Sequence, residues 1–148
     1  MLGKMLAVAA IAHQKQKDKG GRPYFLHCMR VMQGLKTDDE ELMCIALGHD
    51  LIEDTKVTKE ILIKYDRFSD RVIKGIVALT KIEGESYDQY KAKVMQNPDA
   101  ILVKMQDLKD NSDITRLKGV TEKDIKRTIR YYNFYLELEA KAKELKLI

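Results

Sequence analysis

The stretch ALGHDLIEDT, residues 46–55, places four ionisable side chains in a run that otherwise has the apolar character of a buried helix. His49 and Glu53 are four residues apart and would share one line of a continuous helix. Asp50 and Asp54 would share the neighbouring line. Buried charges need partners, and imidazole nitrogens with carboxylate oxygens suit divalent transition metals. The stretch alone fits two interpretations: a metal site, or a solvated helix end.

A metal site needs further ligands, and two residues elsewhere in the chain are candidates. His27 lies in the aromatic and aliphatic segment PYFLHCMRV, where a single histidine is either a core residue or a ligand. Asp107 lies in VKMQDLKDNSD, one turn after Lys104, where an acidic residue is either solvent-facing or a ligand. Taken one at a time, each residue has a sufficient structural explanation.

The elements that position these residues are predicted to be helices. The chain has only two prolines, and strand-like alternation is weak throughout. Thr37, Thr58 and Thr121 are predicted to cap helices. Predicted helices span residues 2–17, 24–34, 37–54, 57–65, 69–80, 87–96, 99–116 and from 121 onward. The prediction is a single all-α domain, a helical bundle of about seven to eight helices over residues 1–148.

Composition narrows the class of protein. Net charge is +4, from 27 Lys and Arg against 23 Asp and Glu, and these charges are interleaved along the chain. Long nucleic acid is therefore not expected as a partner, whereas a small anionic ligand needs only a few lysines. No apolar run is long enough to cross a membrane, and a cytoplasmic location is expected. Cys28 and Cys44 lie in apolar helical surroundings, which predicts buried reduced thiols.

Taken together, the candidate ligands follow the order His, His-Asp, Asp along an all-α chain, which resembles the HD superfamily of metal-dependent phosphohydrolases. A more specific resemblance is to the RelA/SpoT-type (p)ppGpp hydrolase domain, over residues from about 5 to 135. Three consecutive motifs of that domain resemble the segments GRPYFLH, GHDLIEDT and VKMQDLKDN. The Glu-Asp pair after the His-Asp pair is characteristic of that branch. The resemblance implies a stand-alone small alarmone hydrolase, too short to include the synthetase domain of the bifunctional enzymes.

The resemblance also implies residue roles. One divalent ion would be held by His27, His49, Asp50 and Asp107. In this family the ion is typically Mn²⁺, although another divalent transition metal suits the same ligands. Glu53 and Asp54 would orient and deprotonate the attacking water. Asn111 would hydrogen-bond the nucleotide near its ribose. The reaction would cleave the 3′-pyrophosphate of guanosine tetra- or pentaphosphate, giving GDP or GTP and pyrophosphate.

The chain departs from the family pattern at positions that contact the base and phosphates of the nucleotide in the family. A basic pair precedes the PY motif in the family, and its positions fall here on Asp18 and Lys19, with Lys17 just before. Lys17 and Lys19 either contact substrate phosphates or belong to a plain solvated loop. Leu108 stands where Arg or Lys is common. The metal-binding motif is thus intact, while the identity of the nucleotide stays open.

Two other functions remain open at this stage. One is an HD phosphatase that acts on NADPH or another nucleotide and releases orthophosphate instead of pyrophosphate. The other is a binding module that senses a nucleotide without cleaving it. The intact ligand set and the pair Glu53 and Asp54 argue against a sensor, which does not need to activate water.

Overall fold

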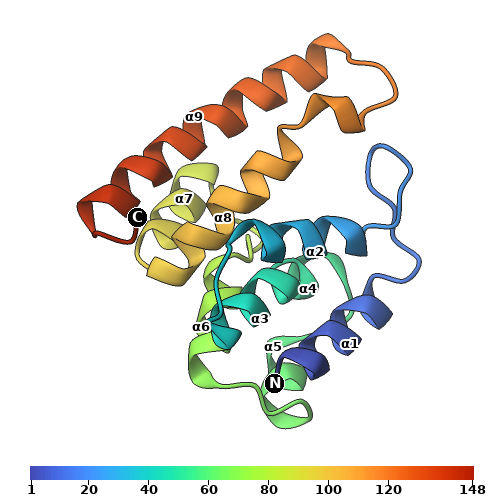
Figure 1. Cartoon of the computed structure of the whole chain (residues 1–148), viewed down its shortest axis with the longest axis vertical. Helices are drawn as coiled ribbons and strands as arrows, with labels where there is room; N and C mark the ends of the chain where they lie inside the picture. The colour runs from blue at the N-terminus through green and yellow to red at the C-terminus, as the bar shows by residue number, and fades with distance from the viewer.

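The computed structural model describes residues 1–148 and contains nine α-helices, one 3₁₀ helix and no β-sheet (Figure 1). The prediction of an all-α fold is confirmed. No helix combines the length and apolar character that crossing a bilayer requires. The elements are α1 (Leu2–Ala12), α2 (Phe25–Gly34), α3 (Glu40–Gly48), α4 (Leu51–Asp54), α5 (Lys59–Lys64), α6 (Asp70–Ala78), α7 (Tyr87–Met95), α8 (Pro98–Asn111), η1 (Ile114–Arg116) and α9 (Glu122–Glu144).

The helix predicted over residues 37–54 is in fact two helices. α3 begins after Asp39, whose carboxylate accepts hydrogen bonds from two backbone amides of the first turn. The prediction of Thr37 as the cap was therefore wrong. The chain leaves the helical path at His49 and Asp50, and α4 follows as a single turn. The two candidate ligands consequently lie at a break between helices and not on one continuous helical face.

The first helix, predicted over residues 2–17, ends at Ala12, because the chain turns at His13. Two predicted helix starts agree better with the structure. Thr58 caps α5 through a hydrogen bond from the backbone amide of Ile61, and Thr121 forms a capping box at the start of α9. The helix predicted over residues 99–116 ends earlier, at Asn111, and η1 follows it. This end matters for the site because it turns the chain back towards the segment before α2.

α3 is the central helix of the core. It contacts α1, α2, α6 and α8, and six of its nine residues are buried. Gly75 of α6 allows close approach, because a Cβ there would lie 2.5 Å from Cδ1 of Ile45. Both cysteines are buried and free, as predicted. The dense packing around α3 fixes the position of its C-terminal end, where His49 follows.

α9 is the longest helix and runs beside α8 and α7 (Figure 1). Its second half is anchored in the core by Phe134, Leu138 and Ala142. Its first turns lie at the upper end of the molecule in Figure 1, close to the loop that precedes α2. α9 therefore contributes one wall to the region in front of the candidate ligands.

Candidate metal centre

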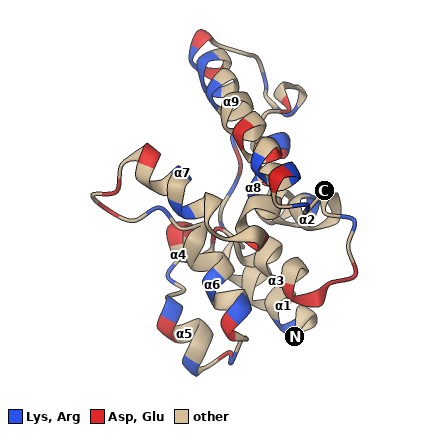
Figure 2. Ribbon diagram, turned by 90° about the vertical axis from the view of Figure 1, so that its left-hand side faces the viewer, with Lys and Arg blue, Asp and Glu red and all other residues tan.

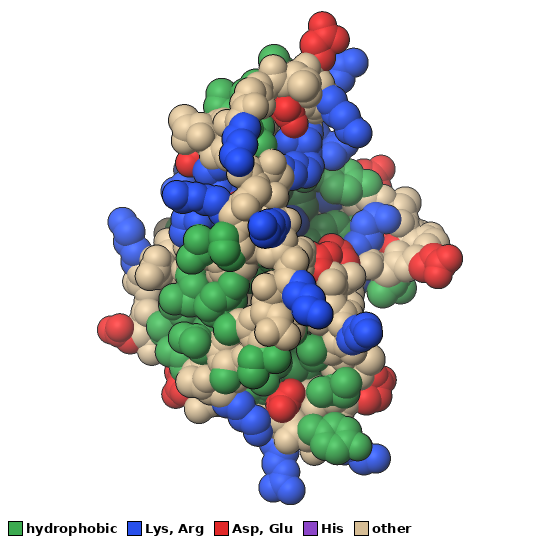
Figure 3. Space-filling model, turned by 90° about the vertical axis from the view of Figure 1, so that its right-hand side faces the viewer, with side chains coloured by type: hydrophobic (Ala, Val, Ile, Leu, Met, Phe, Trp, Pro, Cys, Tyr) green, Lys and Arg blue, Asp and Glu red, His purple; other side chains and the backbone are tan.

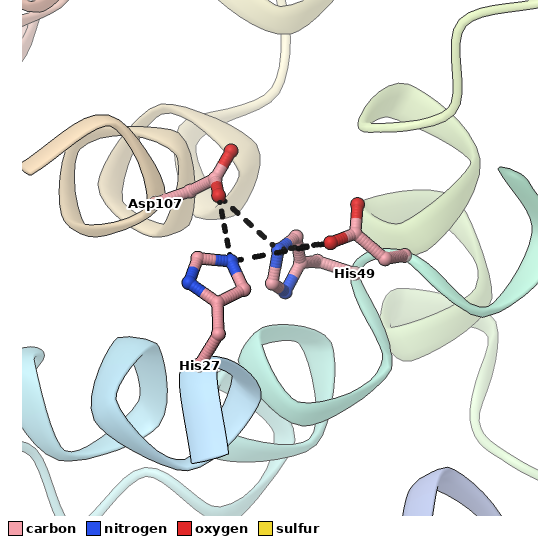
Figure 4. A group of neighbouring side chains, drawn as sticks. His27, His49 and Asp107 are labelled. Carbon is pink, nitrogen blue, oxygen red and sulfur yellow. Dashed lines mark ion pairs between the residues drawn. The ribbon is translucent and has the colours of Figure 1, made fainter. Parts of the chain in front are cut away.

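The structure brings the four predicted ligands together from three parts of the chain. One ligand atom from each of His27, His49, Asp50 and Asp107 lies within 4.8 Å of the others. α2 supplies His27, the break between α3 and α4 supplies His49 and Asp50, and α8 supplies Asp107. Figure 4 shows the side chains of His27, His49 and Asp107 pointing towards one another. Helix packing thus creates a compact cluster from residues up to 80 positions apart.

The cluster combines short distances with unsatisfied nitrogen atoms. Nε2 of His27 lies 3.0 Å from Oδ1 of Asp107, and Nε2 of His49 lies 3.4 Å from the same oxygen. Nε2 of His49 also lies 2.9 Å from Oδ2 of Asp50. Despite these distances, the geometry gives neither buried Nε2 a hydrogen-bond partner. Two imidazole nitrogens and two carboxylate oxygens that face one space fit a divalent transition metal.

In both imidazole rings, the Nδ1 atom has a hydrogen-bond partner on the side of the ring away from the cluster. Nδ1 of His49 lies 2.6 Å from the backbone carbonyl oxygen of Ala46, which can only accept a hydrogen bond. Nδ1 of His27 lies 2.6 Å from Oδ2 of Asp110. With each Nδ1 donating its proton, each Nε2 is left as the ring atom that can coordinate an ion. Burial opposes the protonation of the two rings, but the neighbouring carboxylates outweigh it and raise the pKa of both, so a bound ion would take the place of the proton on Nε2.

The two carboxylates are also fixed by neighbours. The hydroxyl of Tyr24 donates to Asp50. Nζ of Lys104 lies 2.7 Å from Oδ2 of Asp107, and Nδ2 of Asn111 donates to Oδ1 at 2.9 Å. Burial opposes the ionisation of Asp107, but Lys104 and the two imidazoles outweigh it and hold the pKa well below its usual range. Asp107 therefore stays an anionic oxygen donor.

Glu53 and Asp54 lie on α4, directly after the cluster. Oε1 of Glu53 accepts a hydrogen bond from the backbone amide of Lys81 at 2.7 Å. Oδ2 of Asp54 accepts one from Nε2 of Gln16 at 3.3 Å, and Oε1 of Gln16 lies 2.7 Å from Nδ1 of buried His13. Partial desolvation raises the pKa of both carboxyls. Both are therefore held in place while remaining able to take up a proton.

The chain from His13 through Gln16 to Asp54 was missed at the sequence level. In the structure His13 follows α1 directly as its C-cap, and the centroid of its ring lies 5.1 Å from that of Tyr24. The spacing of three residues between His13 and Gln16 is the only pattern in the sequence that could have suggested their contact.

A cavity of about 450 Å³ opens beside the cluster. Four predicted site residues line it: Lys17, Lys19, Asp54 and Asn111. Arg116, Arg127 and Tyr131, which were not predicted, line it as well. Figure 3 shows Lys and Arg side chains gathered in the upper half of one face, around a hollow. The metal cluster thus has an adjoining space with mixed charges in its walls, where four basic residues face three acidic ones, Asp18, Asp54 and Asp113.

Asp18, which stands where the family pattern has a basic residue, does not offer a free negative charge to this cavity. Nη2 of Arg116 donates to its Oδ2 at 2.8 Å, and the backbone amide of Arg22 donates to its Oδ1 at 2.9 Å. Gly20 packs so tightly against the segment of Arg116 that a Cβ there would lie 2.2 Å from the Arg116 carbonyl oxygen. Arg116 therefore brings a guanidinium group to this part of the cavity.

Comparison with known proteins agrees with this geometry. Among curated relatives, the guanosine-3′,5′-bis(diphosphate) 3′-pyrophosphohydrolase of Aquifex aeolicus is 35% identical over 109 residues, which are 67% of this chain and 15% of the relative. The enzyme of the same name from Vibrio cholerae is 31% identical over 140 residues, 86% of this chain and 19% of the relative. The chain thus spans less than a quarter of the length of these relatives.

A solved structure and a family model extend the comparison over the whole chain. The structure of a metazoan ortholog of SpoT, described as hydrolysing ppGpp and playing a role in starvation responses, covers 99% of this chain with a TM-score of 0.69. The two share 22% sequence identity, and the match covers 96% of that structure, so the fold is common to both. The model of the HD domain matches residues 6–109, which include all four residues of the cluster. The chain therefore belongs to the HD domain family.

Proposed function

We propose that this chain is a metal-dependent hydrolase that removes the 3′-pyrophosphate of (p)ppGpp, giving GDP or GTP and pyrophosphate. The observation that carries the proposal is the convergence of two imidazoles and two carboxylates beside the pair Glu53 and Asp54, at the edge of a polar cavity. The pyrophosphohydrolase names of the relatives support the same reaction. The protein would bind this small nucleotide in the cytoplasm.

The proposed ligands of the ion are His27, His49, Asp50 and Asp107. Their nitrogen and oxygen donors suit Mn²⁺, which we propose as the metal, and other divalent transition metals. The bound ion would polarise the scissile phosphate and lower the pKa of a water molecule. The protein keeps the ligands ready for it through the Nδ1 hydrogen bonds of the two imidazoles.

Glu53 and Asp54 would orient the attacking water and accept its proton. Asp54 faces the cavity and is steadied by Gln16, while Glu53 is tied to the backbone amide of Lys81. The pKa values of both carboxyls are raised towards neutral pH, which suits a general base. Asn111, Lys17 and Lys19 line the same cavity and would contact the nucleotide and its phosphates.

The test is an incubation of the purified full chain with ppGpp and Mn²⁺, followed by assays for GDP and pyrophosphate. Pyrophosphate release that stops on addition of a chelator would support the metal, the reaction and the substrate class. No release by metal-loaded protein would refute the proposed substrate. Orthophosphate release from NADPH would then support the alternative phosphatase.

The double variant Glu53→Gln and Asp54→Asn separates an enzyme from a sensor. It preserves the size of both side chains and removes both possible proton acceptors. We expect turnover to fall by at least about 100-fold, since a positioned general base contributes roughly 10²- to 10⁴-fold, while nucleotide binding persists. Unchanged turnover would refute the roles assigned to this pair.

A further inference from the structure

A second hollow, of about 640 Å³, lies along the first turns of α9 and is lined almost entirely by charged residues. We call it the α9 groove. Its basic side chains are those of Lys19, Lys123, Lys126, Arg127 and Arg130. Figure 2 shows the first turns of α9 at the top of the view, where several basic positions follow closely. Glu122 is the only acidic residue in the lining.

Four of these cations have no acidic partner. Arg127 is paired with Asp124 at 2.7 Å, but Lys19, Lys123, Lys126 and Arg130 take part in no ion pair. Burial and the neighbouring positive charges lower the pKa of Lys19. Elsewhere most clustered charges of this chain are balanced, as Arg71 is by Asp39, Glu41 and Asp99. An unbalanced group of like charges around one hollow is a site for an anion.

The α9 groove adjoins the cavity at the metal centre. Lys19, Arg127 and Tyr131 line both spaces. Asp54 and Asn111 also line the cavity, and Asn111 donates a hydrogen bond to Asp107, one of the four proposed ligands. A nucleotide whose 3′-pyrophosphate lies at the metal centre would have its 5′ substituent on the other side of the ribose. The groove therefore lies where a chain of 5′-phosphates would extend.

We propose that the α9 groove binds the 5′-phosphate chain of the nucleotide, and that Lys123, Lys126 and Arg130 make affinity increase with the number of 5′-phosphates. This inference rests on the proposed function. The three side chains are exposed, and each carries its charge at the end of a long stem with several rotatable bonds. They do not touch the four proposed metal ligands, so they would act on binding and not on the chemical step.

The first experiment measures binding without catalysis. Titrations of the full chain with GMP, GDP and GTP in the presence of a chelator should give affinity that increases along this series. The triple variant Lys123→Gln, Lys126→Gln and Arg130→Gln should weaken GTP binding by about tenfold or more, because each exposed charge contact contributes modestly. GMP binding should change little. Equal affinities for the three nucleotides, or an unchanged GTP affinity in the variant, would overturn the proposal.

A matched control removes the same charge elsewhere. Lys4→Gln, Lys64→Gln and Lys143→Gln lie on α1, α5 and the distal end of α9, and all three lysines are exposed. This variant should bind GTP as the wild type does. An equal loss in the control would show a general effect of net charge and would overturn the assignment to the groove.

Hydrolysis provides a second readout that separates this inference from the proposed function. With ppGpp and Mn²⁺, the groove variant should raise KM while leaving kcat unchanged. A reduced kcat at unchanged KM would contradict a binding role. If the wild type cleaves no 3′-pyrophosphate at all, the proposed function fails, whereas the series of GMP, GDP and GTP still decides whether the groove binds phosphates.

Discussion

Asp110 links the candidate metal centre to the rest of the protein. Its carboxylate contacts Nδ1 of His27 at 2.6 Å and accepts hydrogen bonds from Nε of Arg30 at 2.8 Å and Nη1 of Arg116 at 2.7 Å. Burial opposes its ionisation, but His27 and the two arginines lower its pKa to about 2. Asp110 is thus a fixed anion that sets the orientation of the His27 ring. Arg116 continues the chain of contacts to Asp18.

We predict that Asp110→Ala weakens Mn²⁺ binding by roughly 10- to 100-fold, the usual effect of removing the carboxylate behind a ligating histidine. Asp110→Asn keeps a hydrogen-bond acceptor and should have a smaller effect. Calorimetric titration with Mn²⁺ measures both variants. Asp38→Ala, at an exposed position, serves as the control. Metal affinity unchanged in Asp110→Ala would show that His27 needs no support from this carboxylate.

A second prediction concerns Gln16, which joins His13 to Asp54. Gln16→Ala removes the hydrogen bond to Oδ2 of Asp54 and leaves the four proposed ligands untouched. We expect kcat on ppGpp to fall by about tenfold, a fraction of what a positioned general base provides, with unchanged affinity for Mn²⁺. Gln14→Ala, at an exposed neighbouring position, is the matched control. A loss of metal affinity would instead assign Gln16 to the integrity of the metal centre.

The four proposed ligands could be predicted from sequence, but their supports could not. His49 and Asp50 stood out as an unusual pair, whereas His27 and Asp107 were convincing only through resemblance to a family. Arg30 and Asp110 are 80 residues apart, and Asp18 and Arg116 are 98 apart. No local periodicity relates such positions. Their contacts depend on how α2 and α8 pack, which only the folded chain determines.

At the level of elements, α3 shows where sequence reasoning succeeded and where it did not. Its apolar run correctly predicted a buried helix, because six of its nine residues are buried. The end at Gly48 was missed, although glycine after an apolar helical run is a common stop. Gly48 also has a second reason for its position, because a Cβ there would lie 2.9 Å from side-chain atoms of both Ile76 and Met5. The same glycine therefore also serves the packing.

The close packing of α3 on α6 gives a prediction about stability. A methyl group at position 75 would lie 2.5, 2.8 and 3.0 Å from three side-chain atoms of the fully buried Ile45. We expect Gly75→Ala to lower the free energy of unfolding, because overpacking costs about 1–3 kcal/mol. The gain in helix propensity of about 1 kcal/mol would offset only part of that cost. Urea denaturation measures the difference.

Two further variants make this packing argument specific. Ile45→Val removes the atom nearest to the added methyl group, so the double variant with Gly75→Ala should be less destabilised than the sum of the two single variants. Gly3→Ala, in α1, is the control, because nothing lies within 4 Å of the added Cβ. It should leave stability unchanged or slightly increased. Strict additivity in the double variant would show that Ile45 is not the obstacle.

For the whole molecule, the amino-acid composition does not predict where charged side chains gather on the surface. A net charge of +4 with interleaved signs indicates no particular ligand. In the fold, Lys19 from the loop before α2 meets Lys123 and Arg130 of α9, more than 100 positions away. The basic groove therefore arises from tertiary structure and not from a run of lysines. Acidic residues are meanwhile largely used in ion pairs within the protein or in the metal cluster.

The metal centre joins α2, the break between α3 and α4, and α8, so metal binding should stabilise the whole fold. Mn²⁺ at about 100 times its dissociation constant would contribute about 2.7 kcal/mol. For a chain of 148 residues this corresponds to an increase in Tm of roughly 5–10 °C. Differential scanning fluorimetry of chelator-treated protein, with and without Mn²⁺, measures the shift. Mg²⁺ should give a smaller one, because it prefers oxygen ligands alone.

His49→Gln decides whether the stabilisation arises at this centre. The substitution removes one imidazole nitrogen from the cluster, and the increase in Tm with Mn²⁺ should shrink to a small fraction of that in the wild type. An equal increase in the variant would place the metal elsewhere on the chain. The variant itself is expected to be less stable without metal, since His49 is buried and its Nδ1 contacts the carbonyl oxygen of Ala46. The shift caused by the metal, and not Tm alone, is therefore the quantity to compare.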